Sequence, residues 1–565
     1  MSKETVVEAI GETLVRRGVG DVFGVIGSGN LVLANAMRDA GATFWHTRHE
    51  GGAVSAADAY GRVTGDAGVC TVHQGPGLTN TMTALTEAAK SRTPMLVLAA
   101  DVPSSATRSN FALDQAGLAR VAGARYERVS AAGDAPQVIY NAEQYAFAER
   151  RPVVVGLPLD VQPQRLPAGA EVAIMPFALP LPAPPPADVR LAADILAGAR
   201  RPVVIAGRGA VLSNRVHGET GEAPARHGPA RAAIERLGDA VGALYATSAV
   251  AKGFFAGSPY DVGISGGFAS PLAARLIADA DVVVSFGASL NLWTTRHGGL
   301  IGADTQVIQV DIDRGILGAH RPAELGICAD VLPAADAIAA ELEARGERRE
   351  GHRRGDVAEE IKAHRWRDEP YDDASTADTI DPRTLSIALD DSLPAERTVA
   401  VDSGHFMGYP AMYLSVPDPA AFVFTQAFQS VGLGVSSAVG AAVARPDRLT
   451  VAAVGDGGLL MSLGELETAV RLGLRLLVVV YDDAAYGAEV HHFGPSGEDV
   501  DVVRFRDTDF AALARALGAY GWTVRARGDL AAAGEWLTAP DGVALIDAKV
   551  TPHVCAEWLE EAFRR

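Results

Sequence analysis

The chain has 565 residues, of which 48% are hydrophobic and 21% charged, a composition typical of globular proteins with several buried cores. Its 50 Lys and Arg against 69 Asp and Glu give a formal charge of −19, which repels nucleic-acid phosphates and anionic lipid, so we expect neither partner. Three scattered cysteines are too few for a disulfide framework or a zinc site. No apolar run approaches the roughly 20 residues that cross a bilayer, so we expect a cytoplasmic protein.

Strand-like runs alternate with helix-length segments along the chain. Parallel sheets covered by helices on both faces have this pattern. The predicted fold class is therefore α/β, with three doubly wound parallel-sheet domains. The apolar, β-branched runs lie at 95–101, 152–157, 202–207, 281–287, 307–311, 449–455 and 476–482.

Two segments interrupt the alternation and mark the domain boundaries. Residues 166–186 are rich in proline and predict an extended linker, and residues 341–373 are crowded with charge and predict a solvated connector. Each block between them has the size of one doubly wound domain. The predicted domains are 1–165, 187–342 and 380–555, followed by a C-terminal tail at 556–565.

The first domain carries polar residues in glycine-rich segments and directly after short strands. Ser28 lies in a Gly-Ser-Gly turn, and Glu50 opens a helix of small residues directly after a short strand. His73 precedes a glycine-rich turn that contains Gly75 and reaches Asn80. Taken alone, these positions have ordinary structural explanations, because a first-turn glutamate stabilises a helix and a strand-to-helix turn needs glycine.

The most specific pattern lies in the last domain, where a predicted strand runs directly into Gly455-Asp456-Gly457. Glycines at the carboxyl end of a strand let the backbone approach a phosphate, and an aspartate between them can bind a divalent cation. Residues 458–481 hold the next helix and strand, and Asp482-Asp483 follows. Because neighbouring parallel strands end side by side, Asp456 and Asp483 could bind one ion together.

These motifs resemble those of the thiamine diphosphate (ThDP) enzymes of the acetolactate synthase, pyruvate decarboxylase and benzoylformate decarboxylase superfamily. In that superfamily the diphosphate motif is Gly-Asp-Gly followed later by Asn-Asn, where this chain has Asp482-Asp483. The departure keeps an oxygen ligand but adds negative charge. The resemblance implies that Mg²⁺ is bound by the carboxylates of Asp456 and Asp483 and by the backbone carbonyl of Ala485.

The resemblance also assigns roles in the first domain. It implies that Glu50 hydrogen-bonds to the aminopyrimidine ring of ThDP and promotes removal of the C2 proton, in a dry pocket that raises the pKa of the glutamate. Benzoylformate decarboxylase has a histidine and a serine at the positions of His73 and Ser28, where both assist proton transfer to the substrate. Acetolactate synthases usually have neither. Their catalytic glutamine aligns with Phe111, and Gln115 could substitute for it.

Further site residues in the third domain follow from the same resemblance. Val431 matches the apolar side chain that wedges under the thiazolium ring. Glu489 shares a helix face with His492 and could act as an acid or base at the substrate end. The residues expected to contact the cofactor through glycine-rich turns and their neighbours are Gly75, Asn80, Val431, Gly432, Gly455, Gly457, Gly458, Tyr486 and Gly487.

The middle domain is similar to domains that bind a nucleotide. Gly207-Arg208-Gly209, Lys252-Gly253 and residues 263–267 match segments that hold FAD in acetolactate synthases and ADP in oxalyl-CoA decarboxylases. In many relatives the same domain is empty. A structural FAD or ADP and an empty domain therefore both stay open.

We expect a ThDP- and Mg²⁺-dependent enzyme that cleaves or forms a C–C bond beside a carbonyl of a small molecule, with a 2-oxo acid decarboxylase or carboligase favoured by Ser28 and His73. A 2-hydroxyacyl-CoA lyase is the alternative, suggested by Leu113-Asp114-Gln115 and by a tail at 554–565 that could fold over CoA. A ThDP-fold regulatory protein without turnover is a second alternative. The resemblance also implies a homodimer or homotetramer with the cofactor between two chains.

Overall fold

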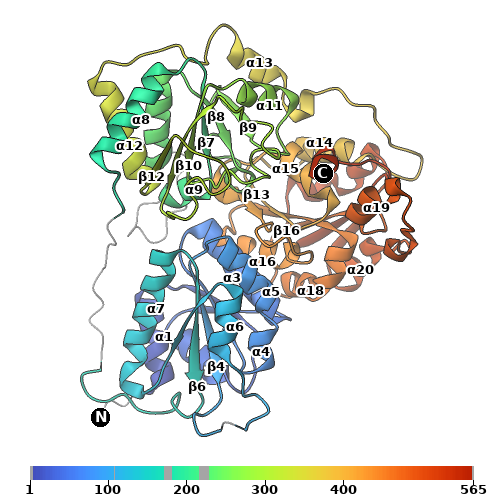
Figure 1. The fold of residues 1–565 in the computed structure, drawn as a ribbon. Helices are drawn as coiled ribbons and strands as arrows, with labels where there is room; N and C mark the ends of the chain where they lie inside the picture. The colour runs from blue at the N-terminus through green and yellow to red at the C-terminus, as the bar shows by residue number, and fades with distance from the viewer. Residues whose placement is uncertain (1–3, 107, 171–180, 215–227, 563–565) are drawn as a thin grey trace.

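The computed structural model describes residues 4–106, 108–170, 181–214 and 228–562. These residues form three parallel sheets of six strands each, with helices packed on both faces (Figure 1). The three sheets confirm the predicted α/β class with doubly wound domains. The linker predicted at 166–186 lies partly outside the described residues. Within the described part of the chain, every helix is too short or too polar to cross a lipid bilayer.

The first sheet has the strand order β2-β1-β3-β4-β6-β5. Helices α3 and α5 cover one face, and α1, α2 and α7 cover the other, so the central strands are apolar on both sides. The strands are β1 (Asp21–Gly24), β2 (Thr43–His46), β3 (Gly68–Val72), β4 (Met95–Asp101), β5 (Arg125–Arg128) and β6 (Pro152–Pro158). The helices are α1 (Val6–Arg16), α2 (Leu31–Asp39), α3 (Glu50–Thr64), α4 (Pro76–Thr79), α5 (Met82–Lys90), α6 (Gln115–Ala122) and α7 (Ala135–Glu149).

The middle sheet has the order β12-β11-β10-β7-β8-β9, in which the chain reverses direction across the sheet between β7 and β10. Helices α8, α10 and α12 cover one face, and α11 and α13 the other. The strands are β7 (Pro202–Ala206), β8 (Leu244–Thr247), β9 (Asp261–Ile264), β10 (Val282–Phe286), β11 (Gln306–Asp311) and β12 (Leu325–Cys328). The helices are α8 (Pro186–Gly198), α9 (Arg208–Ser213), α10 (Pro229–Val241), α11 (Pro271–Ala278), α12 (Val331–Ala344) and α13 (Val357–Ala363).

The third sheet repeats the strand order of the first, as β14-β13-β15-β16-β18-β17. The two domains therefore place corresponding turns at the carboxyl edges of their sheets. The strands are β13 (Arg397–Val401), β14 (Phe422–Phe424), β15 (Leu449–Gly455), β16 (Leu476–Asp482), β17 (Tyr520–Val524) and β18 (Val543–Lys549). The helices are α14 (Pro382–Ser392), α15 (Gly408–Tyr413), α16 (Gly434–Ala444), α17 (Asp456–Met461), α18 (Leu463–Arg471), α19 (Gly487–Phe493), α20 (Phe510–Ala516), α21 (Gly534–Thr538) and α22 (Glu557–Ala562).

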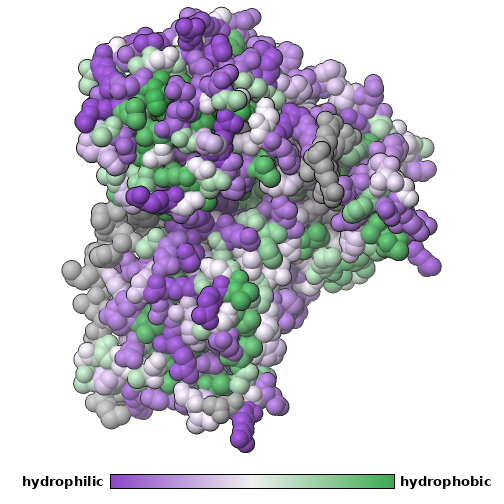
Figure 2. Space-filling model, in the orientation of Figure 1, coloured by the Kyte–Doolittle hydropathy of each residue, from purple (hydrophilic) through white to green (hydrophobic). Residues whose placement is uncertain are grey.

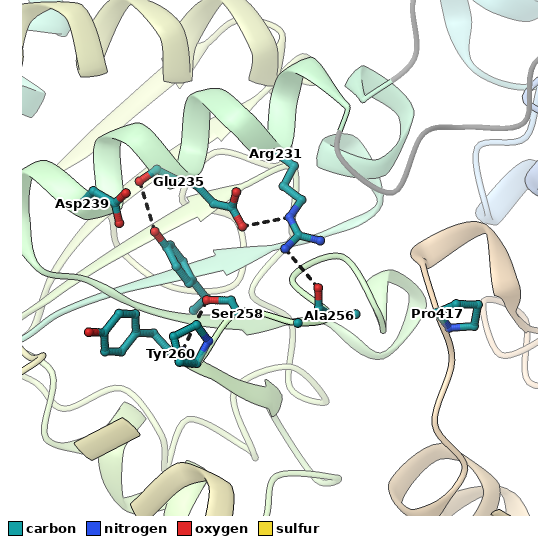
Figure 3. Close-up of a pocket in the computed structure, with 10 residues that line it drawn as sticks. Arg231, Glu235, Asp239, Ala256, Ser258, Tyr260 and Pro417 are labelled. Carbon is teal, nitrogen blue, oxygen red and sulfur yellow. Dashed lines mark hydrogen bonds and ion pairs between the residues drawn. The ribbon is translucent and has the colours of Figure 1, made fainter. Parts of the chain in front are cut away.

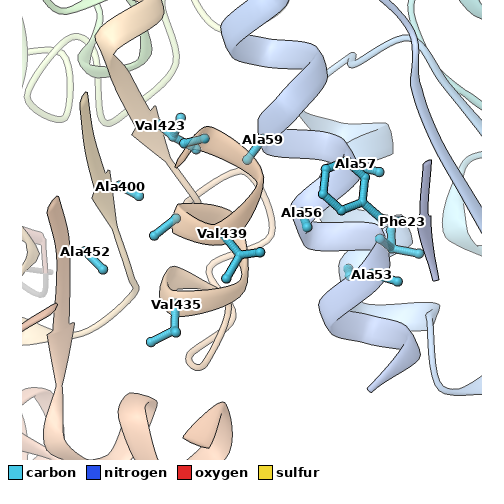
Figure 4. Packing of buried hydrophobic residues seen from close by; sticks show 14 of the residues in the cluster. Phe23, Ala53, Ala56, Ala57, Ala59, Ala400, Val423, Val435, Val439 and Ala452 are labelled. Atoms are coloured by element: carbon cyan, nitrogen blue, oxygen red, sulfur yellow. The ribbon is translucent and has the colours of Figure 1, made fainter. Parts of the chain in front are cut away.

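Helices α3 and α16 join the first and third domains into one apolar core. In Figure 4, Ala56 and Ala59 lie on the side of α3 that faces α16, with Val439 on the adjoining side of α16. A Cβ added at Gly440 would lie only 1.9 Å from the carbonyl oxygen of Ala56, so the two backbones come closer than any side chain would allow. The small residues of both helices are what permits this approach.

Lys252 joins the middle domain to the third. Its ammonium group donates hydrogen bonds to the backbone carbonyls of Ala411 and Leu414, near the end of α15, and lies 5.4 Å from the centre of the Phe422 ring. Burial lowers the pKa of Lys252 to about 7. This buried amine therefore titrates near neutral pH in the folded chain.

We expect Lys252 to add a pH-dependent component to stability. Its pKa of about 7 in the folded chain lies below its ordinary value of 10.5, so between these values the unfolded chain binds more protons and the free energy of unfolding rises with pH. Lys252→Met removes this component. From about pH 7 to about pH 9 the melting temperature of the parent should therefore rise relative to that of the variant. A difference between the two that does not change with pH would contradict the assignment.

Candidate cofactor site

The site lies at the carboxyl ends of three neighbouring strands of the third sheet, β13, β15 and β16. Ligands of open α/β sheets bind in the crevice at this edge. Strand β15 runs directly into α17, of which Asp456 is the first residue, and Asp483 follows the end of β16. The strand register pairs Gly455 with Tyr481, so the two predicted metal ligands lie just beyond the same point of adjacent strands.

Asp456 is buried and Asp483 is half-buried, and the two carboxylates repel each other. Burial and the charge of Asp482 raise the pKa of Asp456 to about 7, and burial and the charge of Asp456 raise the pKa of Asp483 to about 8. The Ala485 N–H donates to Asp483 Oδ1 at 3.2 Å, which brings the backbone of Ala485 to the same place. Among the described residues, no lysine or arginine forms an ion pair with either carboxylate. Carboxylate oxygens without such a partner suit a hard cation, so these residues fit Mg²⁺.

Asp482, the neighbour of Asp483, has a different partner. Its Oδ2 accepts a hydrogen bond from Lys549 Nζ at 2.5 Å, and its Oδ1 accepts from the Ala484 N–H at 3.0 Å. Asp482 and Lys549 are register partners on β16 and β18, and Lys549 also contacts Asp547 at 3.0 Å. Of the two adjacent aspartates, Asp482 is therefore paired with Lys549, and Asp483 remains available to bind a cation.

Glycines at this edge leave space that side chains would fill. A Cβ at Gly487 would lie 2.3 Å from Asp483 Oδ2, and a Cβ at Gly457 would lie 2.7 Å from the ring of Tyr486. Gly432 has φ of +92°, a conformation that glycine adopts without strain. The structure thus brings the predicted glycine turns and Tyr486 together around the two aspartates, with Gly455 and Gly458 in the same strand-to-helix turn.

Asp402, which sequence reasoning missed, holds the turn before α16. Its buried carboxylate accepts hydrogen bonds from the N–H groups of Ser403, Gly432 and Leu433 at 2.8 to 3.1 Å. Burial raises its pKa to about 6. These bonds fix the turn that carries Val431, whose side chain is 37% exposed. Asp402 follows a buried strand, as Asp456 does, and that shared signal could have identified it.

His405 is a second residue that the sequence did not single out. The Ala556 N–H donates to its Nε2 at 3.0 Å, and burial, together with His491, lowers the pKa of His405 to about 3. The ring is therefore neutral with the proton on Nδ1. That Nδ1 lies on the side of Gly487, where an added Cβ would be 3.4 Å away. The C-terminal tail thus contacts the strand-end site through His405.

Glu50 and Asn80 meet at the carboxyl edge of the first sheet. Glu50 is the first residue of α3, and its Oε2 accepts a hydrogen bond from Asn80 Nδ2 at 3.0 Å. The preceding His49 begins the helix by accepting the Gly51 N–H on Nδ1 at 3.0 Å. The hydrogen bond from Asn80 orients one oxygen of the Glu50 carboxylate, and because Glu50 is only half-buried, the carboxylate stays accessible.

His73 lies against the turn that contains Ser28. Its Nδ1 accepts a hydrogen bond from the Gly29 N–H at 3.0 Å, so a neutral ring carries its proton on Nε2. The Phe111 ring packs edge-on against His73 with centroids 5.3 Å apart, and a Cβ at Gly75 would lie 3.1 Å from Phe111. The structure therefore places the turn that contains Ser28 against His73, with Phe111 between His73 and Gly75; the roles of Ser28, His73 and Gly75 stay predictions.

Gln115 and Glu489 are placed differently from the other predicted residues. Gln115 lies in the interior of the first domain, where its Nε2 donates to the Ala100 carbonyl at 2.8 Å. With its amide nitrogen bound there, Gln115 is held in the interior, and its catalytic role stays a prediction. Glu489 is exposed on α19, two residues after Gly487, and its role stays a prediction.

A separate hollow of about 610 Å³ lies in the middle domain beside α10 (Figure 3). Arg231 lines it and donates to Glu235 at 2.8 Å, with Tyr245 and residues 256–260 nearby. The segments predicted to hold a nucleotide are not among the residues that line this hollow. FAD or ADP in the middle domain therefore stays a prediction.

Comparison with known proteins identifies all three domains. Residues 4–119 match the N-terminal TPP binding domain of the thiamine pyrophosphate enzymes, 189–338 match the central domain, and 402–548 match the C-terminal TPP binding domain, thiamine pyrophosphate being another name for ThDP. The chain is 28% identical to a sulfoacetaldehyde acetyltransferase of Castellaniella defragrans, over 99% of this chain and 94% of that one. It is 27% identical to the acetolactate synthase isozyme 2 large subunit of Escherichia coli, with 97% and 94% covered. It is 30% identical to a probable 2-ketoarginine decarboxylase of Pseudomonas aeruginosa, with 98% and 94% covered.

The two predicted metal ligands, Asp456 and Asp483, should respond differently to the two substitutions chosen for them. Asp456→Ala should weaken Mg²⁺-dependent ThDP binding by more than about 100-fold, beyond what changes outside the ligand shell cause. Asp483→Asn keeps an oxygen ligand and should keep the Mg²⁺ dependence. Isothermal titration calorimetry with and without a chelator measures both effects.

Asp482→Asn is the matched control for these variants. It leaves the buried Lys549 with one partner fewer, so it should destabilise the fold by about 2 kcal/mol while ThDP binding persists. Thermal unfolding and calorimetry on the same sample separate the two properties. Loss of Mg²⁺-dependent binding in Asp482→Asn, with binding intact in Asp456→Ala, would contradict the assignment of the ligands.

Proposed function

Because the chain belongs to the thiamine pyrophosphate enzyme family, we propose that it uses ThDP and Mg²⁺ to decarboxylate a small 2-oxo acid. The remaining fragment would be released as an aldehyde or joined to a second carbonyl compound. When bound, ThDP supplies a carbon nucleophile that adds to the carbonyl of the 2-oxo acid and takes up the electron pair left by CO₂. The protein must bind the cofactor, exclude water and move protons.

Residues of the third domain support cofactor binding. Asp456 and Asp483 would hold Mg²⁺ against the diphosphate, with the carbonyl of Ala485 as a further oxygen ligand. The turn fixed by Asp402 would present Val431 to the thiazolium ring. The neutral His405 carries a proton on Nδ1 at this edge and can donate it in a hydrogen bond to an anionic group.

The observation that carries the proposal is the pair of oriented proton-transfer groups in the first domain. Glu50 is held at one oxygen by Asn80, and His73 is held at Nδ1 by the Gly29 N–H. Glu50 can exchange a proton with the cofactor, and the Nε2–H of His73 can donate one to a substrate. Ser28 lies in the turn that packs against the Nδ1 side of the His73 ring. A binding or regulatory protein needs neither group in a fixed orientation.

Exposed apolar side chains around the third-domain site support an oligomer. They are Phe428, Val431, Leu460, Met461 and Tyr486, of which Met461 is 59% exposed. In Figure 2, apolar residues are visible on the third domain at the lower right and along the facing edge of the first domain. We propose that the first domain of a second copy covers these side chains in a homodimer or homotetramer. Glu50 of one chain would then serve the cofactor held by Asp456 of another.

The donor substrate can be identified from covalent adducts. The parent should form a C2 adduct of ThDP with a 2-oxo acid, detected by NMR after acid quench of the enzyme with ThDP and Mg²⁺. Pyruvate, benzoylformate and 2-ketoarginine are the oxo acids to test, together with sulfoacetaldehyde, because two of the similar proteins are named for 2-ketoarginine and sulfoacetaldehyde. An adduct from a 2-hydroxyacyl-CoA alone would contradict the proposal in favour of the lyase, and no adduct from any donor would favour a protein without turnover.

Glu50→Gln tests the role of the oriented carboxylate. The variant should exchange the C2 proton of bound ThDP about 100- to 10,000-fold more slowly than the parent, the range expected for loss of a proton-transfer group. Its affinity for ThDP and Mg²⁺ should change little, because the diphosphate ligands are on the third domain. Glu12→Gln, on the exposed face of α1, is the control. Parent-like exchange in Glu50→Gln would exclude the proposed role.

A further inference from the structure

Glu465, on α18 of the third domain, contacts the segment that begins helix α3 of the first domain. Its Oε1 accepts hydrogen bonds from the N–H groups of Arg48 and His49, both at 3.0 Å, and the side chain is 3% exposed. A Cβ at Gly52 would lie 2.3 Å from the same oxygen. The carboxylate of Glu465 therefore lies against the first turn of α3, with contacts on both sides of Glu50.

Other residues of α18 extend this contact. The Arg48 guanidinium donates to Glu467 at 2.6 and 2.8 Å, and Arg471 donates to the His46 carbonyl at 2.8 Å. Of these carboxylates, Glu465 is the one bonded to the backbone, where it satisfies two N–H groups that precede the helix. Burial raises the pKa of Glu465, and the N–H donors act in the opposite direction.

Glu87 of the first domain makes the reciprocal contact. Its carboxylate accepts the N–H groups of Ala427 and Phe428 at 3.3 and 2.6 Å, in the segment that leads to Val431 and α16. Since the two sheets have the same strand order, α5 and α18 are corresponding helices, and so are α3 and α16. Each domain thus places a buried glutamate under the turn that precedes the corresponding helix of the other. The repetition indicates a role specific to these turns.

We infer that Glu465 is a positioning residue for Glu50, acting through the backbone of Arg48 and His49. The inference rests on the proposed function, in which Glu50 exchanges a proton with the cofactor. Glu465 does not touch the reacting atoms; it fixes the turn from which the Glu50 carboxylate extends. The third domain thereby sets the orientation of the activating group of the first.

The test compares Glu465→Ala with Glu465→Gln and with Glu467→Ala as the matched control on the same helix. Glu465→Ala should slow C2-proton exchange of bound ThDP by about 10- to 100-fold, because small displacements of a catalytic group have effects of this size. Glu465→Gln keeps an acceptor oxygen and should restore exchange to within about threefold of the parent, as should Glu467→Ala. The Kd for ThDP with Mg²⁺ should stay within about threefold throughout.

A second readout does not depend on the cofactor. Amide hydrogen exchange of residues 48–52, followed by mass spectrometry in the cofactor-free chain, should lose protection in Glu465→Ala and keep it in Glu467→Ala. Gly52→Ala covers the case in which Glu465→Ala does not fold, since its methyl group displaces the Glu465 carboxylate. It should show the same selective loss of C2-proton exchange.

A double-variant comparison separates positioning from a general effect on the fold. With Glu50→Gln already in place, Glu465→Ala should cause no further loss of exchange. The inference would be overturned if Glu465→Ala slowed C2-proton exchange equally in the parent and in the Glu50→Gln variant. It would also be overturned by parent-like exchange in both Glu465→Ala and Gly52→Ala. Either result would leave the proposed function intact. A parent chain that binds no ThDP, or shows no exchange when bound, would overturn the proposed function and this inference with it.

Discussion

The close packing of α3 on α16 is the contact on which the rest of the structure depends. At Gly440 the backbones approach so closely that an added Cβ would meet the Ala56 carbonyl oxygen at 1.9 Å. With the two helices this close, Glu465 reaches the backbone before α3, and Glu87 reaches the backbone before α16. Two domains of the same strand order are thereby fixed to each other at the turns that carry their functional residues. A larger residue at Gly440 would move both turns together.

The site also shows how one chain accommodates an aspartate pair. Asp482 and Asp483 are adjacent, yet Lys549 neutralises the first and no lysine contacts the second among the described residues. The pKa of Asp483 is raised accordingly by burial and by Asp456. The pair therefore behaves as one structural ion pair and one candidate ligand. Where related enzymes have Asn-Asn, this chain has two aspartates, and Lys549 on the neighbouring strand β18 neutralises the charge of Asp482.

Much of this arrangement could be predicted from sequence, because it depends on local rules. Buried parallel strands are apolar runs, and the residues directly after them meet at one edge of the sheet, which brought Asp456 and Asp483 together. Lys549, Glu465 and His405 could not be found in this way, since each acts on a residue far along the chain or in another domain. For Gln115, resemblance to known sequences located the loop but not the direction of the side chain. That direction depends on a hydrogen bond to the Ala100 carbonyl, which the sequence does not reveal.

In the oligomer that we propose, the first domain of one chain and the third domain of another form each cofactor site. Subunit complementation tests it directly, by mixing Glu50→Gln chains with Asp456→Ala chains after mild dissociation. Random pairing gives mixed dimers in which one site has both defects and the other has neither, so about a quarter of the parent turnover should return. If Glu50 and Asp456 of the same chain formed one site, every site would keep one defect. Mixtures as inactive as the separate variants, although mixed dimers have formed, would exclude a cofactor site formed between two chains.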